Sequence, residues 1–204
     1  MLGGKKEAGA SKFSIGRFIV EILLIMASVF AALAVDQYRE NYRNEKKAET
    51  ALQYIKGDIT GNLEQIENVV AYHDTIAKNF YQIANKMMGS GTIPDYTDFR
   101  QAAPKGFITP LLENTGWQMA KETNALNYLD YDFVISLSRL YSLQNFYQSK
   151  LDQVGNNLYV ASNISDLSGF TLASLTLLQD MVIQEKKLIK HYKNILQKLE
   201  EYQN

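Results

Sequence analysis

The sequence contains no cysteine, so disulfide bonds, thiolate metal sites, cysteine nucleophiles and lipidated cysteine anchors are all excluded. Proline is scarce, and the three prolines, Pro94, Pro104 and Pro110, lie in one central stretch. The long segments on either side therefore lack the strongest helix breaker, which favours long helices. The formal net charge of -1 gives no basic surplus, so we expect no nucleic acid partner.

Familiar catalytic and metal-binding patterns are also missing. The two histidines, His73 and His191, are far apart in the sequence, and neither belongs to a His-x-x-x-His or Glu-x-x-His motif. No Gly-x-Ser-x-Gly motif occurs. We therefore predict that the protein is not an enzyme and that it has no cofactor and no metal site. Because His73 lies on an apolar stripe, we expect a core histidine bonded to a carbonyl or a tyrosine.

The chain does contain a long apolar segment, residues 18–35, which is interrupted only by Glu21. As a helix it would be about 27 Å long, close to the ~30 Å hydrocarbon core of a bilayer. We predict a basic cytoplasmic tail at residues 1–17, a transmembrane helix at residues 18–35 and an extracytoplasmic domain at residues 36–204. The alternative is a signal peptide, because Ala32-Leu33-Ala34 resembles a cleavage site that would leave a soluble exported protein beginning at Val35.

Polar and small residues within the apolar segment suggest further contacts. Glu21 lies one helical turn after Arg17, so the two can form an ion pair near the headgroups. A role for Glu21 in helix association or partner contact is the alternative. Ala27 and Ala31 are four residues apart, a spacing that allows two spans to approach closely.

Beyond the span, apolar residues recur with the three-four spacing of helices and coiled coils. We predict long helices at residues 49–88, at residues 131–161 and from about residue 169 to the end, a short helix at residues 110–121, and a loop at residues 95–106. The predicted fold class is all-α: the transmembrane helix continues into an antiparallel helical bundle of three long helices plus a short central helix.

Several residues within these helices require an explanation. Gly57 and Gly61 together cost about 2 kcal/mol of helix propensity, which indicates either close packing of another helix or a local bend. Asn62 and Gln144 lie on apolar seams, where they can fix the helix register. The polar face of the last helix, which begins with Glu185 and contains several lysines, is predicted to be solvated.

Aromatic residues provide the ligand hypothesis. Tyr128, Tyr131, Tyr141 and Tyr147 cluster around the second long helix, and together with Trp117 they can line a groove for a ligand or partner. The alternative is that the tyrosines belong to a packed core rim and that Trp117 is a core anchor.

Two stretches of the sequence resemble a family of uncharacterised single-pass membrane proteins of Gram-negative bacteria. One is the span with its exit, residues 20–38, which has an acidic start and closes on Asp36-Gln37-Tyr38. The other is residues 117–126, which begin with Trp117 and are followed by residues 137–141. Ser28 and Asn124 depart from the family pattern, which often has glycine at both positions. The resemblance implies an N-terminal anchor and a helical exterior domain, but no activity.

These observations predict a bacterial inner-membrane protein with a cytoplasmic N-terminus and a periplasmic C-terminal domain. The expected function is interaction or scaffolding, with the lipid bilayer and a membrane or envelope protein, or a second copy of the chain, as partners. The alternative is a ligand-sensing bundle that acts through a membrane partner, because the tail is too short for an output domain of its own.

Overall fold

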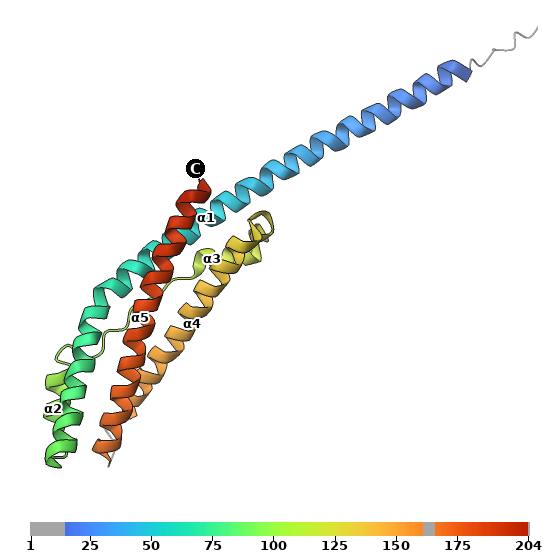
Figure 1. The fold of residues 1–204 in the computed structure, drawn as a ribbon. Coiled ribbons are helices and arrows are strands. Elements are labelled where there is room, and N and C mark those ends of the chain that lie inside the picture. The colour runs from blue at the N-terminus through green and yellow to red at the C-terminus, as the bar shows by residue number, and fades with distance from the viewer. Residues whose placement is uncertain (1–14, 161–165, 204) are drawn as a thin grey trace, which may run out of the picture. The chain divides into compact units, whose positions relative to one another are not determined.

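The computed structural model describes residues 15–160 and 166–203, and these residues form helices without any strand. In chain order the elements are α1 (Ile15–Ser90), α2 (Tyr96–Ala102), α3 (Thr115–Glu122), the short 3-10 helix η1 (Ala125–Tyr128), α4 (Tyr131–Val160) and α5 (Leu167–Gln203), as Figure 1 shows. The all-α prediction is confirmed. Most of the predicted basic tail and of the link before the last helix lies outside the described residues.

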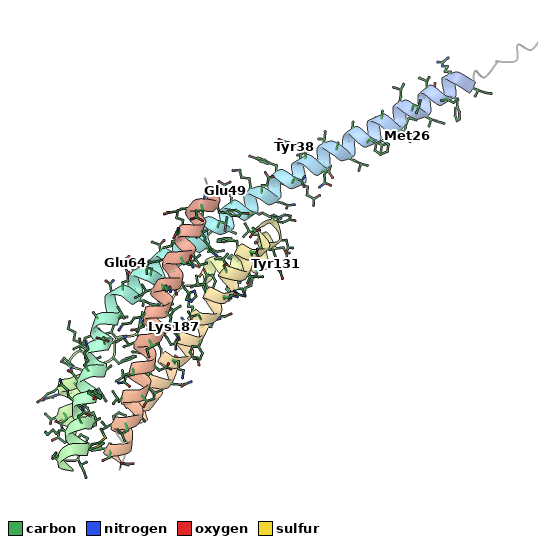
Figure 2. The ribbon with its side chains drawn as sticks, in the orientation of Figure 1. Met26, Tyr38, Glu49, Glu64, Tyr131 and Lys187 are labelled. Carbon is green, nitrogen blue, oxygen red and sulfur yellow. The ribbon has the colours of Figure 1, made fainter. Side chains whose placement is uncertain are left out.

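The chain divides into two compact units, residues 1–46 and residues 47–204. The described part of the first unit is the beginning of α1, whose most apolar 18-residue window has a mean hydropathy of 2.7 and no buried residue. Side chains such as Met26 and Tyr38 project from the helix into open space (Figure 2). Among the described residues, α1 is the one helix long and apolar enough to cross a membrane. Arg17 Nε lies 3.6 Å from Glu21 Oε1, which is the predicted pairing.

The described part of the second unit, residues 47–160 and 166–203, is called the helical unit below. Within it, α5 runs antiparallel to α1. Lys193 Nζ lies 2.7 Å from Glu67 Oε1, and Lys186 Nζ lies 3.3 Å from Asp74 Oδ1. Residue numbers therefore fall along α5 as they rise along α1, which is the order of an antiparallel pair.

α5 also runs antiparallel to α4. The Tyr147 hydroxyl donates a hydrogen bond to Glu185 Oε1, and the Tyr192 hydroxyl donates one to Gln144 Oε1. Since α5 is antiparallel to both neighbours, α1 and α4 are parallel to each other. The chain must therefore travel back along the helical unit between the end of α1 and the start of α4, which a short turn cannot do.

The predicted loop at residues 95–106 is wrong in part, because α2 lies within it. Asp95 accepts hydrogen bonds from the backbone N–H groups of Thr97 and Asp98, and the Asp98 side chain accepts one from the Asp95 N–H. This is a capping box with aspartate in place of glutamate at the third helical position. The Asp-x-x-Asp spacing was visible in the sequence and is the signal that the prediction missed.

The helix predicted at residues 110–121 is also wrong at its start, because α3 begins only at Thr115. The preceding residues, 103–114, contain no helix and are called the connector below. Proline restricts the residue before it to extended conformations and cannot donate a backbone hydrogen bond. Pro104 and Pro110 therefore favour a non-helical connector, whose backbone needs hydrogen-bond partners outside regular secondary structure.

One glycine marks a very close approach between elements. A Cβ atom on Gly116, at the start of α3, would lie 2.6 Å from Ile55 N and 2.6 Å from Tyr54 C of α1. The close packing predicted at Gly57 and Gly61 is not found among the described residues, because a Cβ atom at either position meets nothing within 4 Å. Figure 1 shows that α1 curves within the helical unit, which agrees with the alternative of a bend.

The core of the helical unit is a single apolar cluster to which α1, α4, α5 and the segments between α1 and α4 contribute. Its fully buried large side chains come from all three long helices: Ile55, Ile59, Ile66, Ile76, Leu137, Leu140, Leu178, Met181 and Leu188. Polar residues are buried within it as well, and these define the candidate site.

Candidate functional site

His73 of α1 lies at the centre of a buried polar cluster. Its Nε2 is 2.8 Å from the Ile108 carbonyl oxygen of the connector, and its Nδ1 is 2.6 Å from Glu185 Oε1 of α5. The Phe107 ring stacks on the imidazole at a centroid distance of 4.8 Å. The His73 and Glu185 side chains are both fully buried. The predicted core histidine bonded to a carbonyl is thus found, with a carboxylate as an additional partner.

Glu185 is the largest correction to the sequence analysis, which predicted a solvated side chain. The residue is fully buried because it lies on the same face of α5 as Leu178, Met181 and Leu188. Its Oε1 accepts a 2.7 Å hydrogen bond from the Tyr147 hydroxyl, whereas its Oε2 has no partner among the described residues. Burial, followed by the nearby Glu185 charge, raises the pKa of Tyr147, which keeps the phenol protonated as a donor.

A second polar group holds the end of the connector between α1 and α4. Asn62 accepts a 2.7 Å hydrogen bond from the Glu113 N–H and donates one of 2.7 Å to the Glu113 carbonyl. Gln144 Nε2 donates to the same carbonyl at 3.0 Å, and Gln144 Oε1 accepts from the Tyr192 hydroxyl at 2.8 Å. Both seam residues singled out in the sequence therefore bind the backbone of the connector.

Further side chains bind the connector along its length. The Tyr72 hydroxyl donates to the Gly106 carbonyl at 2.9 Å and accepts from the Lys105 N–H at 3.0 Å. Gln148 Nε2 donates to the Leu112 carbonyl at 3.3 Å. The polar side chains of α1 and α4 thus supply the hydrogen bonds that a helix or a sheet would otherwise provide.

Asp58 extends this arrangement to α3. Its Oδ2 accepts a 2.6 Å hydrogen bond from the Gly116 N–H, one of the free donors at the start of that helix. Burial raises the pKa of Asp58, and the nearby Glu113 charge acts in the same direction, while the backbone hydrogen bonds from Gly116 and Trp117 oppose them. Asp58 therefore positions α3 on α1.

The structure separates the five predicted groove residues. Tyr141, Tyr147 and Trp117 are buried in the core, and the Trp117 ring stacks on Tyr141 at a centroid distance of 5.1 Å. Tyr128 and Tyr131 are exposed, and Figure 2 shows Tyr131 at the beginning of α4. The buried three match the core alternative, so a binding role for the aromatic residues stays a prediction for Tyr128 and Tyr131.

A groove that the sequence analysis did not predict lies between α1 and α5. It has a volume of about 440 Å³. Its lining includes apolar side chains and an ionic bridge in which Asp74 pairs with both Lys78 and Lys186. The lysine hydrogen bonds hold the pKa of Asp74 below its usual value. The lining residues are Asp74, Ala77, Lys78, Tyr81, Gln179, Val182, Ile183 and Lys186.

The buried polar side chains described above make their hydrogen bonds within the chain. His73 and Glu185 have no exposed surface through which a substrate could reach them. Among the described residues, no three histidine, aspartate or glutamate side chains converge as metal ligands. The groove between α1 and α5 is open to solvent, and both apolar and charged side chains line it.

Comparison of the chain with protein-family models, with curated proteins and with solved structures finds no match. The resemblance to single-pass membrane proteins of Gram-negative bacteria therefore stays a prediction that rests on the quoted motifs.

Proposed function

We propose that this protein is a membrane-anchored helical interaction or scaffold protein without catalytic activity. The observation that carries the proposal is the apolar beginning of α1, which has no buried residue in its most apolar window. Exposed apolar surface of this length is costly in water and is stabilised in a bilayer. The candidate span and the part of α1 that belongs to the helical unit form one uninterrupted helix.

The helical unit supports interaction rather than catalysis as its role. Three of its buried polar side chains, Asn62, His73 and Gln144, bind the backbone of the connector. Its accessible groove places the exposed side chains of Tyr81 and Ile183 beside the charges of Lys78 and Lys186. Such a mixture of apolar and charged surface is typical of protein contact sites.

The proposed location is the bacterial inner membrane, with the N-terminus in the cytoplasm and the helical unit in the periplasm. The resemblance described above supports this orientation, and the flanking basic residues do not decide it. The proposed partners are the lipid bilayer and a membrane or envelope protein, or a second copy of the chain.

A matched pair of substitutions tests the anchor. Leu24 and Leu111 are both exposed leucines, but only Leu24 lies within the candidate span. Arginine near the middle of a span costs at least about 2.5 kcal/mol, whereas an exposed connector position carries no such cost. We expect the Leu24→Arg variant to move from the membrane fraction to the soluble fraction. The Leu111→Arg variant should stay in the membrane fraction.

Mass spectrometry of the N-terminus separates anchor from signal peptide. An intact N-terminus on membrane-bound protein supports the anchor. A mature chain that begins at Val35 in the soluble fraction would contradict it and would favour an exported soluble protein.

The interaction itself is tested by affinity capture of the tagged full-length chain from gently solubilised membranes. Ile183→Arg places a charge in the groove, whereas Leu172→Arg places one on an exposed position of α5 outside it. We expect one reproducible partner that is lost with Ile183→Arg and retained with Leu172→Arg. Equal retention by both variants would contradict the groove as the contact site.

Ligand sensing through a membrane partner is the second candidate function, and the volume of the same groove favours it. A small molecule that protects groove residues from exchange in the isolated protein, without any captured protein partner, would favour sensing.

A further inference from the structure

The groove between α1 and α5 is lined by matching positions of the two helices. On α1 these are residues 74, 77, 78 and 81, and on α5 they are residues 179, 182, 183 and 186. Both sets have the spacing i, i+3, i+4 and i+7, so each forms a stripe along one face of its helix. The groove therefore follows the helix axes, which is the direction in which a further helix packs in a bundle.

The groove presents exposed apolar surface. Tyr81 of α1 is 51% exposed, and Ile183 of α5 is 50% exposed. Ala77 and Val182, which also line the groove, are buried and belong to the apolar core. An apolar partner surface that covered Tyr81 and Ile183 would extend this core outward, and burial of such surface is favourable.

The exposed charge on α5 beside the groove is of one sign. Between Asp180 and Glu200 the sequence contains five lysines, all of them exposed, and one acidic residue, Glu185. Because Glu185 is fully buried, it does not offset the lysines at the surface. The formal charge of the exposed side chains in this stretch is therefore entirely positive, although the formal net charge of the chain is -1.

Ion pairs within the chain neutralise only some of these lysines. Lys186 and Lys193 form ion pairs with acidic residues of α1. Among the residues that the structure describes, Lys187 and Lys190 have no ion pair. Each of them lies four residues after a residue that lines the groove, Ile183 or Lys186, so both extend the groove stripe of α5 by about one turn.

We propose that the groove binds an acidic amphipathic helix of another membrane or envelope protein. The inference rests on the proposed function and names the chemistry of the partner. The apolar stripe of the partner helix covers Tyr81 and Ile183, and carboxylates beside that stripe pair with Lys187 and Lys190. Opposite charges across an interface guide the approach of a partner and select it among other proteins.

Carbodiimide cross-linking of the full-length protein in its native membranes is the first test. The reagent joins a lysine amine directly to a carboxylate, so it reports only lysines that contact an acidic residue. Lys193 and Glu67, whose Nζ and Oε1 atoms are 2.7 Å apart, provide the internal control. We expect Lys187 or Lys190 to be joined to aspartate or glutamate in a segment of another protein with apolar residues at helical spacing.

Three results of the cross-linking would overturn the proposal. Links from Lys187 and Lys190 to a second copy of the chain would favour self-association. Links to a segment without helical spacing would exclude a helical partner. Absence of any link from these two lysines, in a sample where Lys193 is joined to Glu67, would leave water or lipid phosphate groups as their neighbours.

A matched pair of charge reversals tests how much the lysines contribute to affinity. Lys190 and Lys86 are both exposed lysines of long helices, but only Lys190 continues the groove stripe. The ligand is a synthetic peptide of the cross-linked segment, titrated against the full-length protein in mild detergent. An exposed ion pair changes an equilibrium constant up to about fivefold, and charge reversal adds a repulsion of similar size. We expect Lys190→Glu to raise the Kd about three- to twentyfold at low salt, and Lys86→Glu to leave it unchanged.

The same titrations distinguish failure of this inference from failure of the proposed function. Sodium chloride should weaken binding of the peptide to the wild type more than binding to Lys190→Glu. Equal Kd values for these two proteins, with a partner that is still lost on Ile183→Arg, would overturn the acidic partner and leave the proposed function standing. If the wild type retains no partner from membranes, the proposed function is contradicted, and this inference with it.

Discussion

Substitution of Gly116 by alanine is the sharpest test of how α3 packs on α1. The new Cβ atom would lie 2.6 Å from Ile55 N and 2.9 Å from Tyr54 O, which are backbone atoms that cannot turn aside. α3 must therefore move away, which strains or breaks the 2.6 Å hydrogen bond from the Gly116 N–H to Asp58.

The expected cost follows from three contributions. Overpacking costs about 1–3 kcal/mol. Loss of the hydrogen bond costs ~1 kcal/mol, since Asp58 is only partly buried. The higher helix propensity of alanine offsets up to ~1 kcal/mol. We therefore expect Gly116→Ala to lower the free energy of unfolding by about 1–3 kcal/mol.

Gly57→Ala is the matched control, because its Cβ atom would meet nothing within 4 Å and the position lies within α1. Here the same chemical change should raise the free energy of unfolding by about 0.5–1 kcal/mol. The assay is urea unfolding of the full-length protein in mild detergent, followed by helical circular dichroism. If the two variants change stability in the same direction, the reasoning from close approach is refuted.

Two further predictions concern buried hydroxyls and the partly buried carboxylate of Asp58. Tyr147→Phe removes a donor from Glu185 and should cost about 1–3 kcal/mol, whereas Tyr141→Phe removes a hydroxyl without a partner among the described residues and should be neutral or stabilising. The urea midpoints of the two variants, compared at constant m-value, measure both changes in stability. Equal losses of stability would contradict the assignment of Tyr147, but not Tyr141, as a hydrogen-bond donor. Burial raises the pKa of Asp58, so at pH values above about 3.9 this carboxyl binds more protons in the folded protein than in the unfolded chain. The contribution of Asp58 to stability therefore falls as the pH rises above about 3.9. Asp58→Asn keeps an acceptor for the Gly116 N–H, so we expect its free energy of unfolding at pH 7 to equal or exceed that of the wild type. Any excess over the wild type should shrink below about pH 4, and a clear loss of stability at pH 7 would contradict this expectation.

Periodicity was sufficient to predict the all-α fold and the approximate positions of the long helices, because amphipathic stripes repeat over many turns. It also placed His73, Asn62 and Gln144 on buried faces. It could not reveal that the last two bind the connector, because their partners are backbone groups, which carry no side-chain signal in the sequence.

The errors have identifiable causes. Glu185 was predicted to be solvated because charged residues usually are, whereas its buried partners, His73 and Tyr147, lie 112 and 38 positions away in the sequence. Gly57 and Gly61 attracted attention within a long helix, whereas Gly116 at a helix start did not, although the close approach occurs there. Such pairings depend on tertiary structure, which a local pattern does not contain.

The connector has a consequence for the order of folding. Its backbone partners are on α1 and α4, and the His73 ring that binds Ile108 is itself held by Glu185 on α5. During synthesis the connector leaves the ribosome well before α4 and α5, so it must wait without its full set of partners until nearly the whole chain has emerged. Docking of residues 103–114 is therefore expected to be a late step, and the unpaired backbone makes the nascent chain most vulnerable to proteolysis in this segment until α5 has packed.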